Sequence, residues 1–156
     1  MTATDQLRRQ LVELPAAEAM ALLGSVQYGR VVFTARALPA VRPVNHLVDR
    51  GDIVIRTNLG TAVSAAVDGT GTGTVVAYQA DHVDPVRRLG WSVVVTGYAR
   101  VVTDPAEVER FETALVPWID GPMDTVIRIH PEIVTGFRLT TQGPTTARPY
   151  RSARSA

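Results

Sequence analysis

Hydrophobic residues recur along the chain at two spacings, one typical of helices and one typical of strands. Near the N-terminus Leu7, Leu11 and Leu14 fall three or four residues apart, which puts them on one face of a helix. The proline after Leu14 can open a second helix, and Gly24 can end it. The pattern therefore predicts two short amphipathic helices in an N-terminal helical segment, residues 4–24.

After this segment the apolar positions are β-branched and alternate, as in strands. The run at 90–102, "GWSVVVTGYARVV", is the longest and is largely apolar on both faces, so we expect it to be buried centrally. The last run should be broken or bulged near His130 and Pro131, because proline cannot donate to a strand ladder. The alternating runs predict strands at 29–35, 40–49, 52–57, 74–79, 90–102 and 125–140.

A helix between the last two strands has explicit start signals. Asp104 can cap it, Pro105 suits its first position, and Glu107 can close a capping box. The sequence therefore predicts a helix over 104–115. Its inward face is expected to carry the apolar residues at helical spacing, which are Val108, Phe111 and Leu115.

Six or seven antiparallel strands with helical additions predict a mainly β fold. We expect a small barrel, residues 29–140, with Greek-key-like connections, within one domain spanning 1–140. Residues 141–156 are expected to form a disordered tail. Side chains fill the interior of a barrel this small, so a large ligand must bind outside it, in a groove or at a subunit interface. This geometry favours a homodimer.

Residues 55–69, "IRTNLGTAVSAAVDG", combine a strand end, a turn and a short Ala/Val run. We expect a short helix capped by Thr57 or Asn58, followed by a flexible "GTGTG" exit at 69–73. Backbone N–H groups at the start of such a helix could hold an anion. The segment is therefore a candidate phosphate cradle, although it contains no lysine.

The composition narrows the possible chemistry. All sixteen basic residues are arginine, and the chain has neither lysine nor cysteine. Schiff-base lysines, Walker-type phosphate loops and cysteine-based metal or nucleophilic sites are thereby excluded. An anion must be held by arginine, backbone N–H or hydroxyl groups. His46, His82 and His130 lie on separate predicted elements, so no metal site is expected, and no Gly-x-Ser-x-Gly motif points to a hydrolase.

The charge pattern bears on partners and location. The net charge of +1 is spread along the chain, unlike the concentrated basic face that binds nucleic acid. No apolar run is long enough to span a membrane, and the first residues lack the apolar core of a secretory signal. We expect a soluble, cytoplasmic protein that acts on a small molecule and binds neither nucleic acid nor membrane.

Four short motifs in order carry a family resemblance: "GRVVF", "RPVNH", "IRTNLG" and "GWSVVVTGYA". Over roughly residues 14–140 the chain resembles the pyridoxamine 5′-phosphate oxidase-like family of FMN-binding split β-barrel flavoproteins, and within it an actinobacterial oxidoreductase-like branch. The resemblance implies a homodimer with one FMN at each of two subunit interfaces. It also implies hydride or electron transfer between the flavin and a small organic substrate, with no obligatory side-chain acid or base.

The resemblance assigns one strand to the flavin ring. Residues Arg42, Pro43, Val44 and Asn45 align with the strand that lies along the isoalloxazine ring and offers it backbone hydrogen bonds. Backbone N–H groups near the ring would stabilise the negative charge that develops on reduction. The alternative is that Asn45 and His46 are ordinary polar residues on the outer face of the strand.

The resemblance also assigns the phosphate turn. Thr57 and Thr61 occupy the two hydroxyl positions of that turn, whereas Ala62 and Val63 stand where the B6 oxidases have arginine and lysine. Two charge-assisted contacts of about 1.5–3 kcal/mol each are missing. Arg56 is the leading candidate to replace them, and Arg42, Arg87 and Arg88 are the others.

Trp91 and Ser92 form the third region of the resemblance. The serine corresponds to a polar residue at the flavin site, and the tryptophan either lies near the ring at the dimer interface or packs in the core. Tyr28, Trp118 and the loop 118–124 are expected to contribute to a substrate pocket, or the loop is only a turn. No catalytic side chain is assigned.

Two alternatives to an FMN enzyme stay open. The same barrel could use the deazaflavin F420, whose long anionic tail also needs a basic groove. Because the phosphate turn lacks its arginine and lysine, the chain could instead be a non-catalytic cofactor-binding protein or an empty paralogue.

Overall fold

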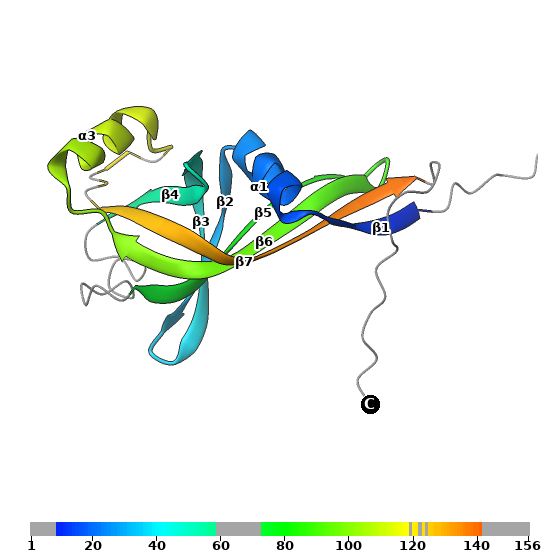
Figure 1. The fold of residues 1–156 in the computed structure, drawn as a ribbon, viewed down its shortest axis with the longest axis horizontal. Helices are drawn as coiled ribbons and strands as arrows, with labels where there is room; N and C mark the ends of the chain where they lie inside the picture. The colour runs from blue at the N-terminus through cyan, green and yellow to red at the C-terminus, as the bar shows by residue number, and fades with distance from the viewer. Residues whose placement is uncertain (1–8, 59–72, 119, 122, 124, 142–156) are drawn as a thin grey trace, which may run out of the picture.

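A computed structural model describes residues 9–58, 73–118, 120–121, 123 and 125–141 (Figure 1). In these residues seven strands and two helices follow one another along the chain. They are β1 (Arg9–Leu14), α1 (Ala16–Ser25), β2 (Tyr28–Ala35), β3 (Leu38–Asp49), β4 (Asp52–Thr57), β5 (Thr74–Asp84), β6 (Leu89–Val101), α3 (Pro105–Ala114) and β7 (Thr125–Thr141). The helix expected after Asn58 and the tail 142–156 lie outside the described residues, so these two predictions stay predictions.

All seven strands belong to one antiparallel sheet with the order β1-β7-β4-β3-β2-β5-β6. Strand β6 also pairs with β7, so six strands close into a ring and β1 is added to the far end of β7. Strands β2, β3 and β4 form a meander, and β5 returns beside β2, which is the order of a Greek key. The mainly β, antiparallel barrel with helical additions is therefore confirmed.

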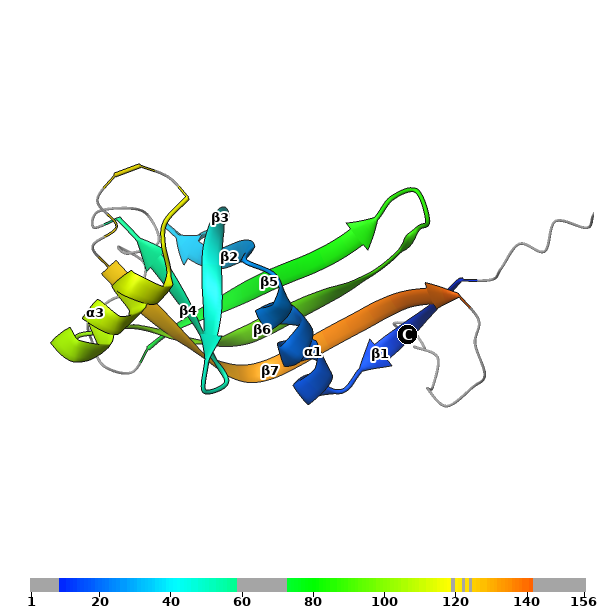
Figure 2. The ribbon, with the colours of Figure 1, turned by 90° about the horizontal axis from the view of Figure 1, so that it is seen from above.

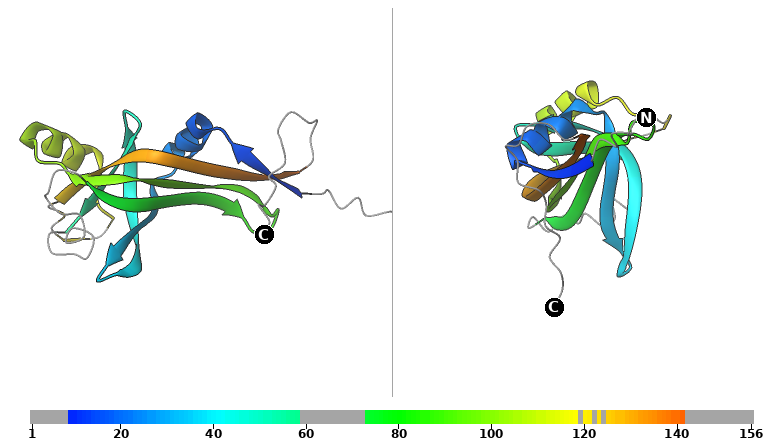
Figure 3. Two further views of the ribbon diagram at one scale, coloured as in Figure 1. Left: turned by 60° about the horizontal axis from the view of Figure 1, so that its bottom comes forward. Right: turned by 90° about the vertical axis from the view of Figure 1, so that its right-hand side faces the viewer.

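Strands β5, β6 and β7 are longer than the barrel itself. Figures 2 and 3 show them running side by side away from α3, with β2 and β3 crossing them steeply. Strand β5 extends to Asp84, five residues beyond the predicted end. The expected irregularity in β7 is confirmed, because the pairing with β6 shifts register where Gly97 faces Pro131 and Thr96 faces Ile133.

The N-terminal prediction needs a correction. Residues 9–14, expected to be helical, form strand β1, which pairs antiparallel with β7 from Arg9 opposite Thr141 to Leu14 opposite Gly136. The extended end of β7 offers a free strand edge, and pairing along this edge outweighs a weak local helix preference. The second helix is present as α1, which begins directly after Pro15 as predicted.

Helix α1 lies across the sheet over β7 and closes one end of the core (Figure 2). Its inner face carries Ala19 and Leu23, which are fully buried. A Cβ atom at Gly136 of β7 would lie only 2.8 Å from the Cβ of Ala19. Helix and strand therefore pack at a distance that only glycine allows.

The barrel interior holds the main hydrophobic core, and β6 contributes one face to it. Trp91, Val93 and Val95 are buried, whereas Val94 and Tyr98 on the opposite face are exposed. The prediction that β6 is buried on both faces is therefore wrong for the single chain. In an antiparallel barrel the inner face alone meets the core, and the outer face needs another layer to be covered.

Helix α3 follows its sequence signals closely. The Asp104 side chain accepts a hydrogen bond of 3.4 Å from the backbone N–H of Ala106, and Pro105 is the first helical residue. Phe111 is fully buried in a smaller core with residues of β4 and β7. The Glu107 carboxylate, expected to close a capping box, instead lies 3.5 Å from the guanidinium of Arg128. No helix of the described part of the chain is long and apolar enough to cross a membrane.

Candidate functional site

Strand β3 has an open edge over much of its length. It pairs with β2 from Leu38 to Asn45, but its pairing with β4 begins only at His46, opposite Ile55. Among the described strands, residues 38–45 of β3 therefore have a neighbour on one side only. The segment assigned by resemblance to the flavin ring, from Arg42 to Asn45, lies on this edge.

The direction of the backbone groups on this edge follows from strand geometry. The N–H of His46 donates to the carbonyl of Gln27, 2.9 Å away, on the β2 side. Because backbone groups alternate in direction along a strand, those of Val41, Pro43 and Asn45 point to the open edge. Proline has no N–H, so the edge offers two N–H donors and three carbonyl acceptors.

His46 points into the barrel, on the opposite face from Asn45. Its Nε2 lies 2.8 Å from the carbonyl of Leu23 and must carry the proton, so Nδ1 accepts from the hydroxyl of Tyr78 at 2.5 Å. Burial lowers the pKa of His46, although the bond to Leu23 raises it, and burial raises the pKa of Tyr78. His46 is thus a neutral core residue, and the alternative that placed it on the outer face of the strand is wrong.

Asn45 points to the outer face and fastens the loop that follows α3. Its Nδ2 donates to the carbonyl of Val116 at 2.8 Å. Two residues further on, the ring of Trp118 meets the ring of Tyr28, with centroids 5.4 Å apart and planes inclined by 55°. Tyr28 is the partner of Asn45 in the β2–β3 register. The structure thus brings Asn45, Tyr28 and Trp118 together beside the open edge.

Arg56, on β4, is engaged with the same loop. Its Nε and Nη2 donate to the carbonyl of Met123 at 3.3 and 2.8 Å, and its Nη1 donates to the carbonyls of Leu115 and Glu112 at 3.0 and 3.3 Å. Guanidinium has five N–H donors, and these contacts use four. In this arrangement Arg56 holds the loop, and its assignment to a phosphate stays a prediction.

The phosphate turn itself is described only at its start. Thr57 is buried, and its Oγ1 donates to the carbonyl of Asn58 at 3.1 Å. Thr61 lies outside the described residues, as do Ala62 and Val63. Arg42 is exposed, and its Nη1 donates to the carbonyl of Val41 at 2.8 Å.

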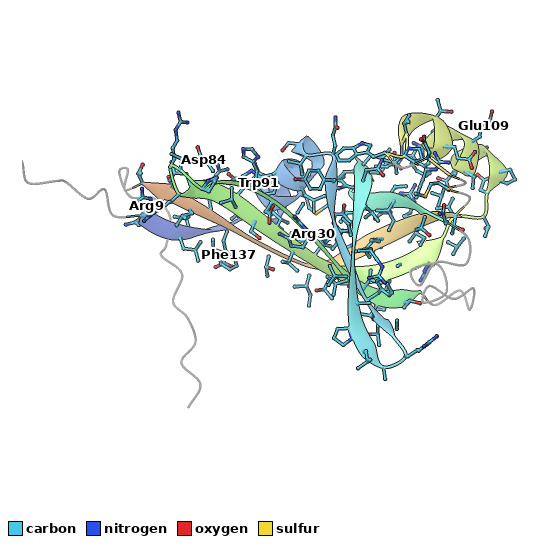
Figure 4. All side chains as sticks on the ribbon, turned by 180° about the vertical axis from the view of Figure 1, so that it is seen from behind. Arg9, Arg30, Asp84, Trp91, Glu109 and Phe137 are labelled. Carbon is cyan, nitrogen blue, oxygen red and sulfur yellow. The ribbon has the colours of Figure 1, made fainter. Side chains whose placement is uncertain are left out.

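Trp91 and Ser92 point to opposite faces of β6. Trp91 is 8% exposed and belongs to the main core, which agrees with the packing alternative. Ser92 lies on the outer face, where its register partners are Asp81 of β5 and Phe137 of β7. Figure 4 shows Trp91 and Phe137 on opposite sides of the sheet.

The sequence did not lead us to predict a polar cluster that lies on this outer face. Arg30 Nη1 lies 3.3 Å from Oε1 of Gln79 and 3.5 Å from Oδ1 of Asp81, and Gln79 Nε2 donates to Asp81 at 2.7 Å. Arg30 also lies over the ring of Tyr28, 5.8 Å from its centroid. The alternation of Gln79 and Asp81 along one strand was a usable signal, but only the β2–β5 register places Arg30 opposite them.

A second charged cluster joins the β3–β4 turn to α3 and β7. Arg128 contacts Asp49 at 2.9 Å and Asp52 at 3.0 Å, and Arg110 contacts Asp49 at 2.9 Å. The hydrogen bond from Arg110, helped by Arg128, lowers the pKa of Asp49 to about 2. These charges are paired with one another and lie away from the open edge. The described residues include no group of three or more histidine, aspartate or glutamate side chains placed to hold a metal.

The closed ring of six antiparallel strands, with β2–β3 crossing long β5–β7 strands, defines a split-barrel protein. The chain belongs to the pyridoxamine 5′-phosphate oxidase family, whose sequence model matches residues 15–138. An uncharacterised protein of Mycobacterium tuberculosis is 55% identical over 144 residues, which are 92% of this chain and 95% of the relative.

Two solved structures have the same fold and recognisable sequence similarity. A Corynebacterium glutamicum protein assigned as a pyridoxamine 5′-phosphate oxidase is 32% identical with a TM-score of 0.69, over 86% of this chain and 97% of the other. An FAD-binding protein of Mycobacterium smegmatis is 30% identical with a TM-score of 0.63, over 82% and 97% of the two chains.

Proposed function

We propose that this chain is a flavin-dependent oxidoreductase that binds the ring of FMN along the open edge of β3. The observation that carries the proposal is the row of backbone donors and acceptors at Val41, Pro43 and Asn45. The pyrimidine side of a flavin presents one N–H between two carbonyl groups, and the carbonyl of Pro43 next to the N–H of Asn45 can pair with that N–H and with one of those carbonyls. Family membership and the flavin bound by the Mycobacterium smegmatis relative support this proposal.

In this proposal the chain positions the flavin ring and stabilises the negative charge that the ring gains on reduction. A bound flavin supplies hydride exchange with the substrate. The N–H of Asn45 would donate towards the part of the ring that gains negative charge on reduction, and preorganised donors of this kind favour the charged state. Pro43 can only accept on this edge. His46 is buried and has partners on both nitrogens, so it is not proposed as an acid or base.

We also propose that two copies associate through the outer face of β5, β6 and β7. This face exposes five large apolar side chains, and register places Val75 opposite Tyr98 and Thr96 opposite Ile133. Exposed contiguous apolar surface on a sheet favours association, and a two-fold interface uses the same surface twice. The five side chains are Val75, Val83, Val94, Tyr98 and Ile133. The polar cluster of Arg30, Gln79 and Asp81 continues this face, so a second subunit would lie close to it.

The experiment is to identify the cofactor of the purified protein. We expect yellow protein that releases FMN on acid treatment, with the flavin identified by mass, and a dimer by light scattering. Titration of flavin-free protein with FMN, FAD and F420 then ranks the three. Preferential binding of FAD or F420 would correct the cofactor and keep the barrel site. Colourless protein that binds none of the three would overturn the proposed function and favour an empty barrel.

A further inference from the structure

The loop after α3 is firmly held yet presents its largest apolar side chains to solvent. Asn45 and Arg56, from two different strands, together make five hydrogen bonds to carbonyls of α3's last turn and of this loop. Val116 is nevertheless 68% exposed and Trp118 62% exposed, and Tyr28 beneath Trp118 is 47% exposed. Neighbouring apolar side chains that are exposed to solvent on a firmly held backbone are typical of a binding surface.

The position of this aromatic surface relates it to the open edge. The backbone of Asn45 points to the edge where the flavin ring is proposed, and its side chain holds the carbonyl of Val116. Tyr28 stands directly opposite Asn45 in the sheet. The Trp118–Tyr28 pair therefore stands on the outer face at the Asn45 end of the proposed ring site.

We propose that Trp118 and Tyr28 form the wall that binds the substrate of the proposed flavin site, and that they select a flat, conjugated ring such as a quinone. This inference rests on the proposed function. Large aromatic faces favour flat ring systems through stacked and edge-to-face contacts. Arg30 places a positive charge beside the wall, because its guanidinium lies over the ring of Tyr28 and 3.5 Å from the carboxylate of Asp81. Its N–H groups can donate to the carbonyl oxygens of a quinone.

The test measures two affinities on each variant: that of flavin-free protein for FMN, and that of FMN-loaded protein for 1,4-naphthoquinone by calorimetry. Replacement of Trp118→Leu should weaken naphthoquinone binding about tenfold, because a stacked aromatic contact is lost. Its FMN affinity should stay within about twofold of the wild-type value. Trp118→Phe, which keeps an aromatic face, should retain most of the naphthoquinone affinity.

Two controls make the result specific. Val86→Ala changes an exposed apolar residue on the β5–β6 turn, at the other end of the molecule from α3, and should leave both affinities unchanged (Figure 2). Cyclohexanone, a carbonyl compound without a flat conjugated ring, should bind wild type and Trp118→Leu equally weakly.

The outcomes separate this inference from the proposed function. Unchanged naphthoquinone affinity in FMN-loaded Trp118→Leu would overturn the aromatic wall alone. A Trp118→Leu protein that is monomeric where wild type is dimeric would assign the wall to the subunit interface and would also overturn it. Failure of the wild type to bind any flavin would overturn the proposed function, and this inference with it.

Discussion

The Nδ1 atom of His46 lies 2.5 Å from the hydroxyl oxygen of Tyr78 inside the barrel. The other imidazole nitrogen contacts the carbonyl of Leu23 at the end of α1, so one side chain links α1, β3 and β5. Both contacts are satisfied by the neutral imidazole with its proton on Nε2. The link holds β3 from inside the barrel, while the same strand offers its open edge outside.

The first prediction concerns stability against pH. The pKa of His46 is lowered from 6.5 in the folded state, so the unfolded state binds more protons between these two values. The stability from neutral His46 is fully present above pH 6.5 and is lost as the pH falls from 6.5 towards the folded pKa. Urea unfolding at pH 5 to 8 should therefore show a steeper fall for wild type than for His46→Gln. Equal slopes would contradict this prediction, because they would show that His46 has the same pKa in the folded and the unfolded state.

Removal of the hydroxyl of Tyr78 should destabilise the barrel. Tyr78→Phe leaves Nδ1 of His46 buried without its donor, which costs about 1–3 kcal/mol in the free energy of unfolding. Thr34→Val removes a hydroxyl from an exposed side chain on β2 and should change the free energy of unfolding by less than about 0.5 kcal/mol. Guanidinium unfolding of both variants measures the difference. Equal effects would mean that the His46–Tyr78 contact adds no net stability.

Arg56 distinguishes loop anchoring from phosphate binding. Because its donors contact the carbonyls of Leu115 and Met123, Arg56→Ala should make the 115–123 loop a preferred site of limited proteolysis. A loop anchor should affect the affinities for FMN and for riboflavin, which lacks the phosphate, by the same factor. We expect that equal change from fluorescence titrations. If FMN affinity falls at least tenfold while riboflavin affinity does not, Arg56 is the phosphate ligand and moves from the loop when FMN binds.

The charged cluster around Asp49 should protect the fold from acid. The pKa of Asp49 falls from 3.8 to about 2 because Arg110 and Arg128 stabilise the carboxylate. Its contribution is present above pH 3.8 and is lost as the pH falls through about 2. Thermal unfolding from pH 2 to 5 should therefore depend less on pH in Asp49→Asn than in wild type. Glu109→Gln, on the exposed side of α3 (Figure 4), is the control and should keep the wild-type dependence.

The local elements were largely predictable from the sequence, and their register was not. Asp104 and Pro105 mark the start of α3 within one turn, and alternation marks β2 to β7. Leu11 and Leu14, in contrast, fit a helix or an edge strand, and only the distant end of β7 decides between them. The outward or inward direction of Asn45 and His46 depends on a one-residue choice of register.

The family motifs single out the strand segment of the candidate site, but they do not predict the side-chain contacts around it. The stretch Arg42 to Asn45 was singled out by family motifs, whereas the carbonyl partners of Arg56 lie 56, 59 and 67 residues away along the chain. Such contacts form only when α3 and its loop fold back onto β4, so they cannot be predicted from the residues next to Arg56 in the sequence. Trp91 shows the same limit, since its neighbours in the core come from several strands.

The most direct test of the central claim is the amide response of β3 to FMN in the full-length, ¹⁵N-labelled protein. The amide of Asn45 points to the open edge, and the amide of its neighbour Val44 points to β2, so the two form a matched pair. Binding of FMN should shift the Asn45 resonance and slow its hydrogen exchange, with a smaller response at Val44. FMN that binds without changing Asn45, or that fails to bind, would contradict a flavin site on this edge.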